Sequence, residues 1–145
     1  REDLNDITAW VKDCARAAAL ATRTEVEMFP VGEPFHELYI SKLGEKLMRE
    51  SYDELGIPCA NQSGMKGSSD IGNVDYRCPA FHPMMGIGIE ENCHTQEFAD
   101  AMTTQGAHDA IKNSASLLLC MTAKMYGNPQ LLQQIKADHK AYRGY

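Results

Sequence analysis

The sequence lacks the patterns that identify several common functional classes. No run of about 18 apolar residues occurs, so no membrane-spanning helix is predicted. The chain has no long basic block and a formal net charge of -6, which argues against a nucleic-acid interface. The G-x-S-x-G elbow, the P-loop and the dinucleotide fingerprint are also missing. What remains, with 43% hydrophobic and 23% charged residues, is the composition of a soluble globular protein.

The cysteines do not form a recognisable framework. There are five of them, an odd number, and no C-x-x-C pair is present. This pattern favours reduced thiols in a reducing compartment over a set of disulfides, so a cytoplasmic location is expected. A structural zinc bound by Cys59, Cys78 and Cys93 is a less favoured alternative, because the paired knuckle spacing is absent.

Apolar periodicity, turn residues and cap residues predict a mixture of helices and strands. Helices are expected at residues 3–21, 37–55, 95–102, 107–126 and 129–142. Strands are expected at residues 24–31, 74–78 and 81–89. Gly56 is predicted to end the second helix, and Asn128 with Pro129 is predicted to begin the last one. Gly32 and Pro34 break the pattern, so a domain boundary is expected between segments 1–31 and 32–145.

Two segments contain the residue types expected of a functional site. Gly67, Ser68, Ser69 and Asp70 form a glycine-rich turn in which a carboxylate and small hydroxyls can contact a ligand. The alternative for Asp70 is a turn or helix cap. His94 directly precedes a predicted helix, where a neutral imidazole is a good zinc ligand. The alternative for His94 is a loop histidine that hydrogen-bonds backbone.

Other titratable residues are weaker candidates. Glu90 and Glu91 precede His94 and invite a general-base role, although a solvated pair at a strand end fits them equally well. His36 and His139 are predicted to face solvent.

The order of the motifs resembles a known family. The motifs are the string from Gly67 to Val74, then Pro79, His82-Pro83 and Gly86-Ile87-Gly88, and finally His94-Thr95-Gln96-Glu97-Phe98. Together they resemble the C-terminal part of the zinc aminoacylase/carboxypeptidase amidohydrolase superfamily. The nearest branch contains aminobenzoyl-glutamate hydrolase and β-alanyl-lysine-type dipeptidases. The similarity continues through the long helix and Asn128-Pro129-Gln130-Leu131-Leu132.

The resemblance implies an α/β fold with two domains. Residues 1–31 would be the last helix and strand of an inserted ferredoxin-like lid that often dimerises. Residues 32–145 would be the C-terminal part of the catalytic domain. The chain would then be a C-terminal fragment, inactive alone, of an enzyme that forms a homodimer.

The resemblance also implies a reaction. A pair of zinc ions, or in some members manganese, would activate water to hydrolyse the amide bond of an N-acyl amino acid or dipeptide. His94 would hold one metal ion, and the Gly67–Asp70 turn would contact the substrate. The remaining ligands and the glutamate general base would lie upstream of Arg1. The alternative from another functional class is a non-catalytic interaction or subunit-assembly module.

Overall fold

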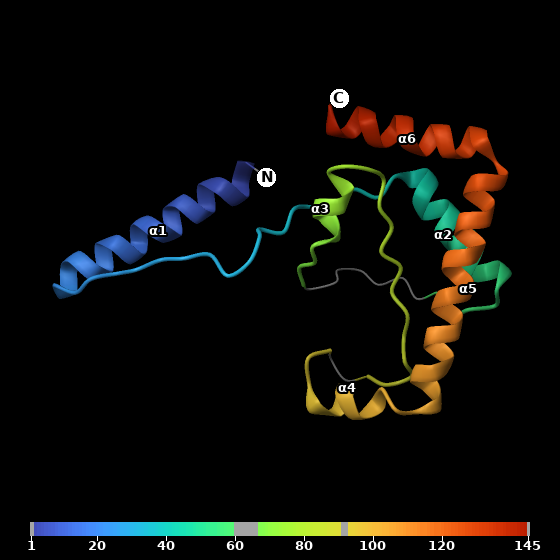
Figure 1. Ribbon diagram of the computed structural model, residues 1–145, viewed down its shortest axis with the longest axis horizontal. Coiled ribbons are helices and arrows are strands. Elements are labelled where there is room, and N and C mark those ends of the chain that lie inside the picture. The colour runs from blue at the N-terminus through green and yellow to red at the C-terminus, as the bar shows by residue number, and fades with distance from the viewer. Residues whose placement is uncertain (1, 60–66, 91–92, 145) are drawn as a thin grey trace.

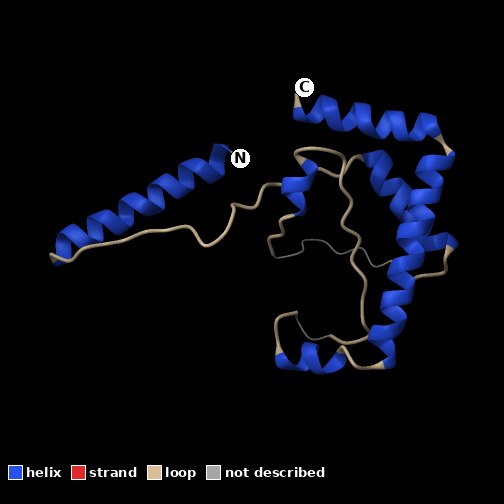
Figure 2. Cartoon of the chain, viewed as in Figure 1, coloured by secondary structure: helices blue, strands red, loops and turns tan. Residues whose placement is uncertain are grey.

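In the described part of the chain, the regular secondary structure is α-helix alone. The computed structural model describes residues 2–59, 67–90 and 93–144, and these contain no β-strand (Figures 1 and 2). The helices, in chain order, are α1 (Glu2–Thr22), α2 (Lys42–Glu54), α3 (Ile71–Asp75), α4 (Gln96–Ala101), α5 (Gln105–Gly127) and α6 (Pro129–Arg143). Among these described residues, no helix is both long enough and apolar enough to cross a bilayer.

The helices begin where side chains satisfy the free amide groups of the first turn. The Thr95 hydroxyl accepts a hydrogen bond from Phe98 N at 3.2 Å and starts α4. Asn128 Oδ1 accepts from Leu131 N at 3.1 Å, and Pro129 occupies the first turn of α6. The predicted start of the last helix is therefore confirmed. Four of the five predicted helices agree with α1, α4, α5 and α6 to within about two residues, the usual uncertainty of helix ends.

Helix α2 begins five residues later than predicted, at Lys42 instead of 37. Ser41 is its N-cap, and its hydroxyl accepts from Gly44 N at 2.9 Å. The preceding residues stay extended because two of their backbone amides are held by side chains of α3, described below. Gly56 follows the end of the helix with a φ of 63°, the left-handed conformation that makes glycine a common helix terminator.

The core lies between α2 and the middle of α5. Tyr52 and Ile57 come from α2 and the loop after it, whereas Leu117 and Met121 come from α5. Phe81 and other partly buried side chains of the segment after α3 pack against this cluster. Helix α6 contributes Ile135, which is 2% exposed. This packing holds together α2, α5, α6 and the extended segment beside them.

The predicted α/β fold is wrong for the described residues, because none of the three expected strands forms. Residues 74–78 belong to the end of α3 and the turn after it. Residues 24–31 and 81–89 are extended but unpaired within the described part of the chain. Residues 81–89 alternate between half-buried and exposed positions, as a strand would. Alternation and β-propensity favour an extended backbone, but a strand also needs a hydrogen-bonded neighbour, which local sequence does not supply.

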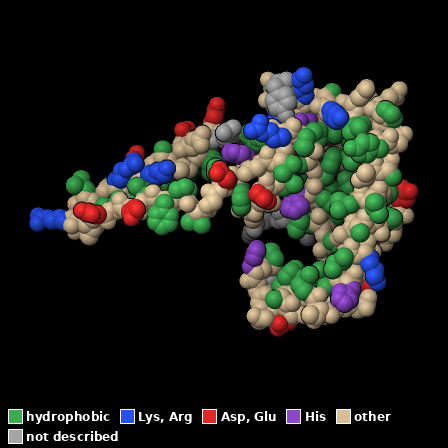
Figure 3. Space-filling view, in the orientation of Figure 1, with side chains coloured by type: hydrophobic (Ala, Val, Ile, Leu, Met, Phe, Trp, Pro, Cys, Tyr) green, Lys and Arg blue, Asp and Glu red, His purple; other side chains and the backbone are tan. Residues whose placement is uncertain are grey.

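Helix α1 extends away from the other helices (Figure 1). None of its residues is buried, and Figure 3 shows hydrophobic side chains along its outside. Met28, Phe29 and Pro30 of the following segment line an open hollow together with Ile7 and Val11 of α1. The division into segments 1–31 and 32–145 stays a prediction.

Gly72 of α3 is a position where only glycine fits. The helix touches the preceding extended segment there, and an added Cβ would overlap the carbonyl oxygen of His36. We expect Gly72→Ala to lower the free energy of unfolding by about 3 kcal/mol, because a backbone oxygen cannot rotate away from the overlap. Urea unfolding measures this. The matched control is Gly67→Ala, where an added Cβ meets nothing within 4 Å and the change should stay below about 0.5 kcal/mol. Equal effects of the two substitutions would show that the close contact between Gly72 and His36 does not exclude a side chain.

Candidate functional site

His94 lies in the turn before α4 and is exposed. Its φ is 69°, and Arg23 is the other non-glycine residue with a positive φ in the described part of the chain. A left-handed conformation is uncommon for residues other than glycine, and such residues cluster at functional sites. Because Thr95 is the N-cap of α4, the imidazole stands just outside the helix. A ring in this position can bind a ligand from solvent without unpacking the core.

The Gly67–Asp70 turn leads directly into α3. Gly67, Ser68 and Asp70 are exposed, and Ser69 is half-buried. The Ser69 hydroxyl accepts from Ile71 N at 3.3 Å, whereas the Asp70 side chain makes no cap hydrogen bond. Asp70 N-caps α3 through its backbone carbonyl, which accepts from Asn73 N at 2.8 Å. Its carboxylate, not used as a cap, lines an open hollow together with Glu33, Phe35, Asn73, Val74 and Arg77.

His94 and the Gly67–Asp70 turn lie in different parts of the structure. Figure 1 shows α3 near α6, whereas α4 lies at the opposite end of α5. Across the described ranges, no hydrogen bond or ion pair joins His94 to residues 67–70. Glu90, the other candidate beside His94, is exposed, and Glu91 lies outside the described residues. The described candidates are exposed or half-buried, but the structure does not bring His94 into contact with the Gly67–Asp70 turn.

The described residues alone do not form a complete metal site. In the part of the chain that the structure describes, no three His, Cys, Asp or Glu side chains come together as a metal site. The five cysteines are free thiols, and Cys59, Cys78 and Cys93 are exposed. A zinc ion needs three or four ligands, so these residues do not fit a complete site. His94 can supply one ligand at most.

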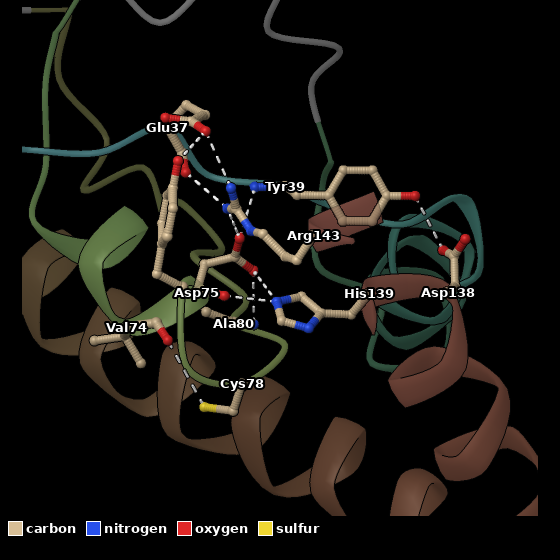
Figure 4. A network of polar contacts seen from close by, with 10 residues as sticks. Glu37, Tyr39, Val74, Asp75, Cys78, Ala80, Asp138, His139 and Arg143 are labelled. Atoms are coloured by element: carbon tan, nitrogen blue, oxygen red, sulfur yellow. Dashed lines mark hydrogen bonds and ion pairs between the residues drawn. The ribbon is translucent and has the colours of Figure 1, made fainter. Parts of the chain in front are cut away.

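A buried polar cluster is centred on Asp75, at the C-terminal end of α3 (Figure 4). This side chain is completely buried and forms an ion pair with Arg143 of α6, whose own side chain is only 5% exposed. The Asp75 carboxylate also accepts from Tyr39 N at 3.1 Å and Ala80 N at 3.4 Å. A buried carboxylate is stable only when its charge and lone pairs are matched in this way.

His139 contacts the same residue from one turn earlier in α6. Its Nε2 lies 2.5 Å from the Asp75 carbonyl oxygen and 3.4 Å from the carboxylate. Since a carbonyl oxygen can only accept, Nε2 carries the proton. His139 is 3% exposed, so the prediction that it faces solvent is wrong. The sequence did contain a signal, because His139 follows buried Ile135 by four residues and therefore lies on the same face of α6.

Glu37 and aromatic rings complete the cluster. The Arg143 guanidinium donates to Glu37 Oε1 at 3.0 Å and to the Glu37 carbonyl at 2.9 Å, and it lies 3.9 Å from the centre of the Tyr76 ring. Tyr39 stacks on Tyr142 with 3.8 Å between ring centres. Three segments that are distant in sequence therefore meet at one buried charge. Sequence reasoning missed Asp75 and Arg143, because no local pattern pairs residues 68 positions apart.

Glu37 should make the stability of this cluster depend on pH. Its pKa is lowered from 4.5 to about 2, mainly because the Tyr76 hydroxyl donates to its carboxylate. A lowered folded pKa adds stability above pH 4.5 that is lost as the pH falls toward 2. The side chain is 45% exposed, so screening by water limits the effect to about 1 kcal/mol.

We therefore expect Glu37→Gln to lower the free energy of unfolding by about 1 kcal/mol at neutral pH, with the difference disappearing as both proteins are acidified. Urea unfolding across this pH range measures it. Glu25→Gln, at an exposed position, is the control and should change little at any pH. A Glu37→Gln effect that persists in strong acid would contradict the assignment.

Comparison with known proteins indicates similarity to dipeptidases. No family model matches the chain. The human Xaa-Arg dipeptidase is 30% identical in an alignment of 143 positions, which covers 96% of this chain and 33% of the human protein. The mouse Xaa-Arg dipeptidase is 27% identical over the same shares of the two chains. This chain therefore spans about a third of the length of the curated relatives it matches. The predicted resemblance is confirmed as similarity to a dipeptidase, and the particular branch stays a prediction.

Proposed function

We propose that this chain is part of an enzyme that hydrolyses the peptide bond of dipeptides. The observation that supports this most strongly is its similarity to Xaa-Arg dipeptidases over 96% of its length. The relatives' name gives the substrate class that we propose, dipeptides with a C-terminal arginine. Since the chain matches only a third of those proteins, the activity proposed is that of the complete gene product that contains it.

His94 is the residue of this chain that we propose as a metal ligand. Its exposure supports this, because solvent can reach the imidazole, and its left-handed backbone is of a kind that clusters at functional sites. Zinc is the proposed metal, with manganese as the alternative, and it would supply a Lewis acid for attack of water on the amide. The described residues do not make a complete metal site, so the other ligands would come from residues outside them. The general base is proposed to lie there too, as the family resemblance implies.

The Gly67–Asp70 turn is the proposed substrate contact. Ser68, which is exposed, can donate its hydroxyl to a carboxylate of the dipeptide, and the carboxylate of exposed Asp70 can attract a cationic group. We also propose that the complete protein is a homodimer, as the family resemblance implies. The apolar residues of α1 support this, because Ile7, Trp10 and Val11 are 56%, 73% and 62% exposed. Exposed apolar side chains of this kind mark surfaces that are buried against a partner.

The test uses the complete gene product with zinc or manganese added. Ala-Arg and Ala-Leu are supplied as substrates, and released amino acids are measured by chromatography. We expect hydrolysis of both, with kcat/KM at least about tenfold higher for Ala-Arg, a difference that one charged contact can provide. Absence of hydrolysis with either metal would contradict the proposal. Equal rates for the two dipeptides would reject the arginine preference while leaving the peptidase activity intact.

A further inference from the structure

The buried cluster around Asp75 has a consequence for the Gly67–Asp70 turn. Helix α3 has only five residues, and a helix this short is unstable without tertiary contacts. Of these five residues, Gly72 and Asp75 are buried, whereas Val74 is 49% exposed. The two apolar side chains of α3, Ile71 and Val74, are half-buried and exposed, so polar contacts supply much of what holds the helix in place.

Those polar contacts come from two segments far from α3 in sequence. Asn73 Oδ1 accepts from His36 N at 2.9 Å, and Asn73 Nδ2 donates to the Pro34 carbonyl at 3.1 Å. On the other side, Arg143 pairs with the Asp75 carboxylate, and His139 donates to the Asp75 carbonyl. The last turn of α6 therefore holds the C-terminal end of α3 (Figure 4).

The turn is joined to the other end of α3. Asn73 N donates to the Asp70 carbonyl, and Ser69 Oγ accepts from Ile71 N, so residues 69 and 70 move with the first turn of the helix. Because α3 is so short, its two ends are separated by little more than one helical turn. A displacement of Asp75 is thereby transmitted to the Gly67–Asp70 turn.

We propose that Arg143 is a positioning residue for substrate binding. It acts from α6 through Asp75, and it holds the Gly67–Asp70 turn in the orientation that receives the dipeptide. This inference rests on the proposed function, because it assumes that the turn contacts substrate. Arg143 itself lies at the opposite end of α3 and does not touch the substrate. Its removal should therefore weaken substrate binding without impairing the chemical step, since binding of the ground state and of the transition state is lost equally.

The test compares Arg143→Met with Lys140→Met in the complete gene product. Lys140 is an exposed cation on the same helix and is a matched control for charge. Hydrogen exchange is measured at the backbone amides of residues 71–78, with α2 and α5 as internal references. Steady-state kinetics with Ala-Arg provides the second readout. Arg143→Lys keeps the charge and serves as the conservative variant if the methionine variant does not fold.

We expect Arg143→Met to speed exchange at residues 71–78 by at least about tenfold while α5 is unchanged. KM should rise about tenfold with kcat within about twofold of the unsubstituted enzyme. Arg143→Lys should recover part of both effects, and Lys140→Met should show neither. The inference would be overturned if exchange became faster while KM stayed unchanged, or if exchange did not change. It would also be overturned if kcat fell by as large a factor as KM rose. An inactive unsubstituted enzyme would overturn the proposed function instead, and the exchange data would then report on the Arg143 contact alone.

Discussion

His94→Ala is expected to reduce hydrolysis of Ala-Arg by the complete gene product about a thousandfold, equivalent to about 4 kcal/mol of transition-state stabilisation. The reason is the loss of a direct metal ligand. Changes to groups that only support a ligand already cost about 10–100-fold in metal affinity or activity. Bound zinc, measured by mass spectrometry after gel filtration, should fall in the same variant.

Two further substitutions make this prediction specific. His94→Asn tolerates the left-handed backbone, so the fold should be retained while activity is lost. His108→Ala removes an exposed imidazole near the start of α5 and should leave kcat and metal content within about twofold. Full activity in His94→Asn would show that the ring is not needed and would reject its role as a ligand.

Asp75→Asn is expected to lower the free energy of unfolding by about 3 kcal/mol, the largest stability effect that we predict from a single change of charge. Asparagine keeps the shape and one acceptor, but it leaves the buried Arg143 guanidinium opposite a neutral group. The Arg143 guanidinium would keep only the partly exposed Glu37 carboxylate as a counter-charge, while its buried partner is lost and water cannot replace it. Removing one partner of a buried ion pair is costly for this reason. Chemical denaturation monitored by circular dichroism measures the loss.

The control for this prediction is Asp53→Asn, an exposed carboxylate on α2, which should change stability by less than about 0.5 kcal/mol. A double-mutant cycle with Arg143→Met isolates the pair itself. We expect a coupling energy of at least about 1 kcal/mol, because the two side chains are in direct contact. Additive effects of the two substitutions would show that the pair contributes no energy of its own.

The sequence predicted helices well because their signals are local. Asn128 and Pro129 mark a helix start in any context, and the apolar spacing of α1 defines a helix even though none of its residues is buried. The start of α2 was wrong because residues 36–39 are held extended by Asn73 and Asp75, which are more than 30 positions away. The strands were wrong for a related reason, since pairing depends on neighbours that residues 81–89 do not specify themselves.

The candidate site shows the same difference between local features, which the sequence predicted, and distant contacts, which it did not. The sequence correctly placed His94 just before a helix, which the structure has at Gln96–Ala101, and its role as a metal ligand stays a prediction. The Asp75–Arg143 pair was missed because Asp75 lay inside a predicted strand and because no spacing rule relates it to Arg143. His139 was misplaced although its distance of four residues from Ile135 indicated a buried face. Periodicity should therefore be applied to histidines as well as to aliphatic residues.

Crystals of the zinc-loaded complete gene product would show whether His94 binds the catalytic metal. Diffraction data collected on both sides of the zinc absorption edge locate the metal independently of any atomic model. We expect an anomalous peak about 2.0–2.1 Å from a ring nitrogen of His94, the normal zinc–imidazole distance. A zinc peak bound by other residues, with the His94 ring directed into solvent, would contradict it.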